Sequence, residues 1–130
     1  MERILVVDDE QPVRDTVSLL LRQEGFRVVV AECGHSAASA IEAFTFDVAL
    51  VDIVMPGIDG LETIAILRQD APHLSIIAMS GYATVSGLAE QDIFRSAMER
   101  GATCCLHKPF TREQLLDTIE FCRLSRSMVA

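Results

Sequence analysis

Five short apolar runs recur along the chain, and longer segments with helical periodicity separate them. The runs predict strands at 3–7, 27–31, 47–51, 75–79 and 103–106. Strands that alternate with helices are typical of βα units, in which each crossover helix returns the chain to a parallel neighbour. We therefore expect an α/β fold built on a parallel sheet, with the strand at 47–51 covered on both faces because it is almost wholly apolar.

The segments between the strands carry apolar residues at helical spacing. The first helix is expected to begin near Pro12 and to stop near Gly25. Thr111 and Gln114 predict a capping box at the start of the last helix. The side chains expected to face the core are Val13, Val17, Leu20 and Leu21; Ala37, Ala38, Ile41 and Phe44; Leu61, Ile64, Ala65 and Leu67; Phe94, Ala97 and Met98; and Leu115, Ile119 and Cys122.

The length of 130 residues favours one domain, and half of the residues are apolar, which disfavours disorder. No apolar run approaches the ~20 residues that span a bilayer. The apolar stretch behind Met1-Glu2-Arg3 is too short for a signal peptide, so we expect a cytoplasmic protein without membrane insertion. We expect a domain over residues 1–123 and a short tail over 124–130, with no effector domain.

The formal net charge of −8 disfavours nucleic acid as a direct partner, because phosphate backbones are bound by clustered Lys and Arg. The charge is compatible with a basic protein partner or a bound metal ion. Acidity that simply keeps a small protein soluble explains it equally well.

The chain has four cysteines, and none forms a CxxC pair. Cys104 and Cys105 are adjacent in a predicted strand and should point to opposite faces, which disfavours a shared metal ion or a disulfide between them. We interpret Cys33, Cys104, Cys105 and Cys122 as small core or half-buried residues, with a redox role as the alternative.

Polar residues follow four of the predicted strands. Asp8 and Asp9 come after the first strand, Asp52 after the third, Ser80 after the fourth and Lys108 in the segment after the fifth. In an open parallel sheet, active groups gather beyond the carboxyl ends of the strands. Each residue alone has an ordinary interpretation, as a helix cap, a turn former or a solvated lysine. Together they predict a site for a hard cation and a phosphoryl group.

Convergence of these carboxylates requires a cation. Two like charges ~4 Å apart repel by about 4 kcal/mol at an effective dielectric constant of 20. Mg²⁺ fits because it takes oxygen ligands and shares carboxylates with phosphate oxygens, whereas the pattern lacks the His and Cys ligands of zinc. An aspartate can attack phosphorus and form an acyl phosphate, with a metal ion and a lysine stabilising the transferred group. Phosphoryl transfer onto an aspartate is therefore the leading hypothesis.

Four segments match a known family. Residues 6–10, 51–60, 79–81 and 101–110 resemble the receiver domain of bacterial two-component response regulators, in particular the chemotaxis regulators, and the resemblance covers about residues 2–123. It implies a flavodoxin-like, doubly wound sheet of five parallel strands in the order 2-1-3-4-5, with about five helices.

The resemblance also implies roles for single residues. Asp52 would accept a phosphoryl group from a phosphohistidine on a sensor histidine kinase or phosphotransfer protein, as in a phosphorelay. Lys108 would bind the phosphoryl group, Ser80 would be the switch hydroxyl, and the Lys108–Pro109 peptide would be cis. The implied Mg²⁺ ligands are Asp8, Asp9, Asp52 and the backbone carbonyl of Val54.

Three features depart from the family pattern. Cys105 replaces the usual aromatic residue of the switch. The segment from Ser80 to Gly101 is longer than is usual, so we expect the helix after 82–92 to be displaced, shortened or mobile. Val54 and Tyr82 occupy positions that govern water access to the acyl phosphate, and their side chains suggest slow self-dephosphorylation.

These observations favour a signalling phosphoacceptor over an enzyme, with output through a downstream protein target and a possible phosphorylation-dependent dimer. The alternatives are a binding module of the same fold that is not phosphorylated, and a receiver excised from a larger transcriptional regulator. A haloacid-dehalogenase-like phosphatase would need a second aspartate at the position of Val54. A nucleotide or flavin pocket is disfavoured because no Gly-rich loop follows the first strand.

Overall fold

The computed structural model describes residues 2–54, 60–81 and 90–128. The elements in chain order are β1 (Arg3–Val7), α1 (Gln11–Gln23), β2 (Arg27–Ala31), α2 (Gly34–Ala43), β3 (Val48–Asp52), α3 (Gly60–Asp70), β4 (Ser75–Ser80), α4 (Glu90–Arg100), β5 (Cys104–His107) and α5 (Arg112–Met128). All five predicted strands are present. β3 and β5 lie one residue further along the chain than predicted, because Asp52 and His107 still pair with β4 although they are polar.

The five strands are parallel and lie in the order β2-β1-β3-β4-β5, which confirms the flavodoxin-like topology. β1 pairs with both β2 and β3, and its last residue, Val7, is opposite Val51 of β3. The strand order therefore reverses between β1 and β3, and ligands of open α/β sheets bind at such a switch point.

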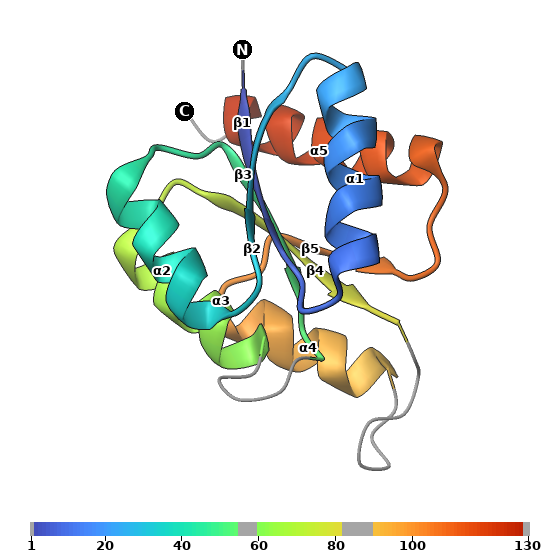
Figure 1. Ribbon diagram of the computed structural model, residues 1–130. Coiled ribbons are helices and arrows are strands. Elements are labelled where there is room, and N and C mark those ends of the chain that lie inside the picture. The colour runs from blue at the N-terminus through green and yellow to red at the C-terminus, as the bar shows by residue number, and fades with distance from the viewer. Residues whose placement is uncertain (1, 55–59, 82–89, 129–130) are drawn as a thin grey trace.

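Helices cover both faces of the sheet. In Figure 1, α1 and α5 lie on one side, and α2, α3 and α4 lie on the other. Alternate residues of β1 serve the two sides, since Ile4 packs with the α1 and α5 layer and Leu5 packs with the opposite layer. All of β3 is buried, as expected of a central strand in a parallel sheet.

The helix ends follow the predicted signals. α1 begins at Gln11 with Pro12 in its first turn. The capping box of α5 is confirmed, because the Thr111 N–H donates to the Gln114 side chain at 2.9 Å and the Gln114 N–H donates to the Thr111 hydroxyl at 3.0 Å. α5 continues to Met128, beyond residue 123, where the sequence pattern placed the end of the domain.

Three side chains predicted to face the core are exposed. Phe44 is 46% exposed because it follows α2 with an extended backbone, and its ring lies edge-on to Phe46 and 4.8 Å below the Arg3 guanidinium. Phe46 takes the buried position instead. Ala65 and Met98 are exposed because they fall one position past the buried stripes of α3 and α4.

Arg68 connects α3 to the end of α4, a contact that the sequence pattern did not indicate. Its Nε and Nη2 atoms donate to the Gly101 carbonyl at 3.0 and 2.8 Å, and its Nη1 donates to the Pro72 carbonyl at 3.0 Å. Gly101 has φ +119°, a conformation that favours glycine, and a Cβ atom there would lie 2.7 Å from the Arg68 side chain. Burial lowers the pKa of Arg68, but the guanidinium remains charged. Arg68 thus anchors the carboxyl end of α4.

Among the residues that the structure describes, no helix has the length and apolar character needed to cross a membrane.

Replacing Arg68 with methionine should destabilise the domain by about 1–3 kcal/mol, because partly buried carbonyl groups lose charged donors. Arg95→Met is the control, since Arg95 is 70% exposed and pairs only loosely with Asp92 at 3.5 Å. Urea unfolding of both variants measures the difference. Equal losses of stability would contradict the anchoring role.

Candidate functional site

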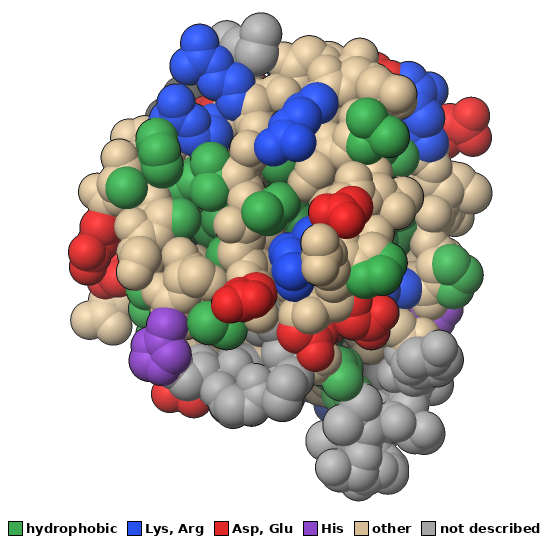
Figure 2. All heavy atoms as spheres, in the orientation of Figure 1, with side chains coloured by type: hydrophobic (Ala, Val, Ile, Leu, Met, Phe, Trp, Pro, Cys, Tyr) green, Lys and Arg blue, Asp and Glu red, His purple; other side chains and the backbone are tan. Residues whose placement is uncertain are grey.

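The carboxyl ends of β1 and β3 bring three aspartates together. Asp8 directly follows Val7 in β1, and Asp52 directly follows Val51 in β3, so the strand pairing places both at the same edge. One carboxylate oxygen from each of Asp8, Asp9 and Asp52 lies within 4.8 Å of the others. The predicted convergence of the three carboxylates is therefore confirmed. Figure 2 shows several acidic side chains toward the centre and lower part of the face of the molecule that is in view.

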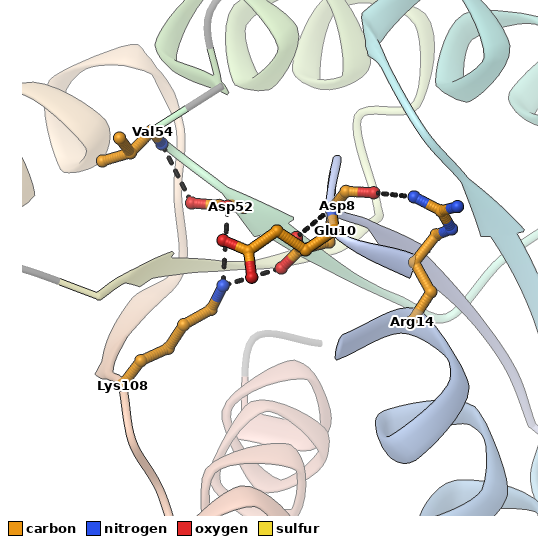
Figure 3. A network of polar contacts seen from close by, with 6 residues as sticks. All are labelled: Asp8, Glu10, Arg14, Asp52, Val54 and Lys108. Carbon is orange, nitrogen blue, oxygen red and sulfur yellow. Dashed lines mark hydrogen bonds and ion pairs between the residues drawn. The ribbon is translucent and has the colours of Figure 1, made fainter. Parts of the chain in front are cut away.

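Asp8 is fully buried and is held by four contacts. One carboxylate oxygen accepts the Glu10 N–H at 2.9 Å, and the other accepts the Lys108 ammonium at 2.7 Å. Its backbone N–H donates to Ala31 at 3.1 Å, and its carbonyl accepts Arg14 Nη1 at 2.8 Å (Figure 3). Sequence reasoning missed Arg14. Arg14 lies in the first turns of α1, six residues after Asp8, and no motif or spacing in a single sequence indicates that its side chain contacts the Asp8 carbonyl.

Asp52 is 4% exposed, and its two carboxylate oxygens have different surroundings. One accepts the Val54 N–H at 2.9 Å, and the other lies 3.5 Å from Lys108 Nζ. Burial raises the pKa of Asp52 to about 6, and repulsion by Asp8 and Asp9 adds to the shift. The Val54 N–H and Lys108 oppose it. At neutral pH the Asp52 carboxylate is therefore mostly ionised and can act as a nucleophile.

Lys108 balances the negative charge of this cluster. Burial alone would lower the pKa of Lys108, but the hydrogen bond that Lys108 donates to Asp8 and the charges of Asp52 and Asp8 raise this pKa overall. The ammonium therefore stays protonated between the two carboxylates. The backbone N–H of Lys108 also donates to the Ser80 carbonyl at 2.8 Å, which fixes the Lys108 backbone against the end of β4.

The chain passes very close to the backbone of Asp52 at the start of α3. A Cβ atom at Gly60 would lie 2.1 Å from the Asp52 carbonyl oxygen and 2.2 Å from the Ile53 Cα, so only glycine fits. This close approach holds the backbone that carries the Asp52 carboxylate. Residues 55–59, which connect Val54 to α3, lie outside the described part of the chain.

The donor set fits Mg²⁺. All three candidate ligands are carboxylate oxygens, the type that Mg²⁺ prefers. One oxygen of each carboxylate lies within 4.8 Å of the others, so the three groups are close enough to share one cation. Asp8, Asp9 and Asp52 would hold the ion, and the exposed Asp9 leaves room for water ligands.

An open cavity of ≈ 590 Å³ lies beside Asp52 and Lys108. Its wall is polar near these two residues and apolar along α1 and the start of the β5–α5 connection. The lining residues are Glu10, Pro12, Val13, Thr16, Val17, Asp52, Val54, Gly81, Lys108, Pro109 and Phe110. A partner that fills this cavity can place a reactive group next to Asp52.

The other predicted site features have mixed outcomes. Ser80 is buried at the end of β4, at the same edge of the sheet. The Lys108–Pro109 peptide is cis, as predicted. Cys105 faces α4, and its thiol lies 3.9 Å from the Phe94 carbonyl. Tyr82 lies outside the described residues, as does most of the long segment before α4.

Asp52→Asn should change how stability depends on pH. The folded protein raises the pKa of Asp52 from 3.8 to about 6, so the folded state binds more protons than the unfolded state between these values. The contribution of Asp52 to stability therefore falls as the pH rises through this range. Relative to Asp52→Asn, the metal-free wild type should lose on the order of 1–2 kcal/mol between about pH 4 and pH 7, after allowance for solvent screening.

Urea unfolding in a chelating buffer measures this difference. Asp70→Asn, which removes an exposed carboxylate at the end of α3, should keep the wild-type pH dependence. The interpretation is wrong if the wild type and Asp52→Asn respond to pH in parallel.

Curated relatives share most of this sequence. FleR, a response regulator of Pseudomonas aeruginosa, is 30% identical over 117 residues, which cover 90% of this chain and 24% of FleR. PhoB, the phosphate regulon transcriptional regulatory protein of Klebsiella pneumoniae, is 36% identical over 118 residues, which cover 91% of this chain and 50% of PhoB. The chain thus spans a quarter to a half of these relatives.

Solved structures of similar length share the fold. The chemotaxis protein CheY4 of Vibrio cholerae matches with a TM-score of 0.82 at 30% identity, over 94% of this chain and 98% of CheY4. The response regulator TrrA of Thermotoga maritima, in complex with Mg²⁺ and BeF, matches with a TM-score of 0.79 at 30% identity, over 94% of this chain and 99% of TrrA. The response regulator receiver domain family matches residues 4–120. Because this match runs from β1 into α5, the protein belongs to the family of response regulator receiver domains.

Proposed function

We propose that the protein accepts a phosphoryl group on Asp52 from a phosphohistidine of a histidine kinase or phosphotransfer protein, with Mg²⁺, and signals through protein contacts. The observation that carries this proposal is the gathering of three carboxylates and one ammonium at the switch point of the sheet. Membership of the receiver domain family supports it.

The reaction needs an ionised nucleophile and a fixed cation. A carboxylate oxygen of Asp52 attacks phosphorus, the bond between phosphorus and the histidine nitrogen breaks, and its electron pair returns to the imidazole. Lys108 Nζ lies between Asp8 and Asp52, where its positive charge stabilises the negative charge of the transferred group. Asp8, Asp9, Asp52 and the Val54 carbonyl would hold Mg²⁺, which would supply further neutralisation of the phosphoryl charge. The Ser80 hydroxyl is the proposed switch group.

Signalling requires that the phosphorylated site alter a surface. β5 and α4 support such a route, because the Cys105 thiol lies 3.9 Å from the Phe94 carbonyl of α4. The family resemblance implies an aromatic switch residue at the position of Cys105. A small thiol fills less space than a ring, so the coupling between site and surface differs from the usual aromatic switch. A phosphorylation-dependent dimer and a cytoplasmic location remain predictions.

The relatives widen the range of possible outputs. The matched transcription factor of Saccharomyces cerevisiae, SKN7, and the regulator PhoB are named for transcription, and the chain spans 17% and 50% of them. A receiver that belongs to a larger transcriptional regulator is therefore the second candidate. In that case nucleic acid would be bound by another part of the protein, since the net charge of −8 disfavours direct binding here.

A small phosphodonor such as acetyl phosphate should label the protein at Asp52 in the presence of Mg²⁺. Intact-mass spectrometry should show the addition of one phosphoryl group, which EDTA and the Asp52→Asn substitution both abolish. Asp70→Asn, on the exposed surface of α3, should label like the wild type. Equal labelling of Asp52→Asn would exclude Asp52 as the acceptor, and a failure of the wild type to label would favour a binding module that is not phosphorylated.

Replacing Val54 with asparagine should shorten the lifetime of the phosphorylated protein several-fold. The Val54 side chain lines the cavity beside Asp52, and a polar group there can position water for attack on the acyl phosphate. Release of inorganic phosphate from protein labelled beforehand measures the lifetime. Val30→Asn is the control and should leave the lifetime unchanged, because Val30 is an exposed residue of β2, the outermost strand of the sheet.

A further inference from the structure

Two cysteines that are distant in the sequence meet between β5 and α5. The Sγ atoms of Cys104 and Cys122 lie 3.3 Å apart, although the residues are 18 positions apart in the chain. Cys104 packs on the α1 and α5 side of the sheet, and Cys105 packs on the other side, which confirms that the adjacent pair points to opposite faces.

We propose that Cys104 and Cys122 form a reversible intramolecular disulfide when the protein meets a hydroperoxide. A disulfide bond is about 2.0 Å long, so the two sulfur atoms need to approach by only about 1.3 Å from their separation of 3.3 Å. Sulfur atoms in direct contact have no group between them that must move away. This thiol chemistry is separate from phosphorylation at Asp52.

The surroundings of the two thiols set the order of events. Cys122 is fully buried, whereas Cys104 is partly exposed. An oxidant therefore reaches Cys104 first, and Cys122 acts as the resolving thiol. Within the described residues, Cys33 and Cys105 have different environments, since Cys33 contacts Ser36 at the start of α2 and Cys105 contacts α4.

The reaction balances with one hydroperoxide. The Cys104 sulfur attacks the terminal peroxide oxygen, the O–O bond breaks, and the thiol proton goes to the departing alkoxide, which leaves as an alcohol or, from hydrogen peroxide, as water. The Cys122 sulfur then attacks the sulfenic sulfur of Cys104, the S–O bond breaks, and water leaves. Two thiols and one peroxide thus give one disulfide, with two electrons passing from sulfur to oxygen.

The surroundings of the two thiols also set the rate at which they are oxidised. The hydrogen bond with Cys122, together with burial, raises the pKa of the Cys104 thiol. The thiolate is the reactive form, so the pair should oxidise slowly compared with the exposed, acidic cysteines of fast redox sensors. We therefore expect a response to sustained rather than brief exposure.

The disulfide would act on the segment that carries Lys108. The segment between Cys104 and Cys122 contains the rest of β5, Lys108 and the first turns of α5. A covalent bond would fix the distance between β5 and the middle of α5 and would close this segment into a loop. Closure restricts the unfolded chain, so the oxidised domain should resist unfolding better than the reduced one.

Peptide mapping after treatment with hydrogen peroxide tests the proposal. Free thiols are first alkylated, and the protein is then digested with trypsin, which separates 101–112 from 113–123. The monomer should lose two hydrogen atoms and yield these two peptides joined, and dithiothreitol should separate them. The proposal fails if Cys122 stays alkylatable after prolonged treatment, or if the only disulfides join two protein molecules.

The peptide 101–112 contains both Cys104 and Cys105, so mapping alone does not say which of them is joined to Cys122. Variants make this assignment. Cys105→Ser should still form the bridge, and Cys104→Ser should not. Urea unfolding provides the second measurement, in which peroxide should raise the midpoint of the wild type and of Cys105→Ser but not that of Cys104→Ser. Bridging by Cys104→Ser, or equal midpoints of the oxidised and reduced wild type, would overturn the proposal.

Discussion

The repulsion among three carboxylates at one edge of the sheet is the constraint on which the site depends. Asp8 and Asp52 are nearly inaccessible to water, and Asp9 adds a third charge within 4.8 Å. Lys108 offsets part of this charge, at 2.7 Å from Asp8 and 3.5 Å from Asp52. One ammonium cannot balance three carboxylates, and the pKa of Asp52 is raised mainly by burial, with a smaller contribution from repulsion by Asp8 and Asp9. The site therefore favours a further cation, and that requirement links metal binding to the proposed phosphoryl transfer.

Several backbone contacts keep this crowded arrangement in place. The Glu10 and Val54 N–H groups each hold one carboxylate oxygen, and the Arg14 guanidinium holds the carbonyl of Asp8. Gly60 allows the start of α3 to press against the Asp52 backbone. These contacts fix Asp8 and Asp52 before any ligand binds, so the repulsion between these two carboxylates does not relax by rotation of their side chains. Preorganisation of this kind is what electrostatic stabilisation of a transferred group requires.

Local patterns predicted the strands, most of the core and the residues of the site, because each depends on periodicity or on the end of an apolar run. Val48–Asp52 is an example, since its apolar character and the aspartate at its end were both visible in the sequence. The helical spacing of apolar residues predicted the buried side chains less accurately near the helix ends. Phe44 continues the apolar spacing of α2, yet the backbone becomes extended there and the ring turns to Arg3 and Phe46.

The sequence alone determined that the chain forms βα units and that acidic groups and a lysine follow the strands, because these features depend on neighbouring residues. Only the tertiary structure decided which distant groups meet. The hold of Arg68 on Gly101, the contact of Arg14 with the Asp8 carbonyl and the meeting of Cys104 with Cys122 are such cases. Each depends on how two elements pack or on which rotamer a long side chain takes, and one sequence carries no periodic signal for either.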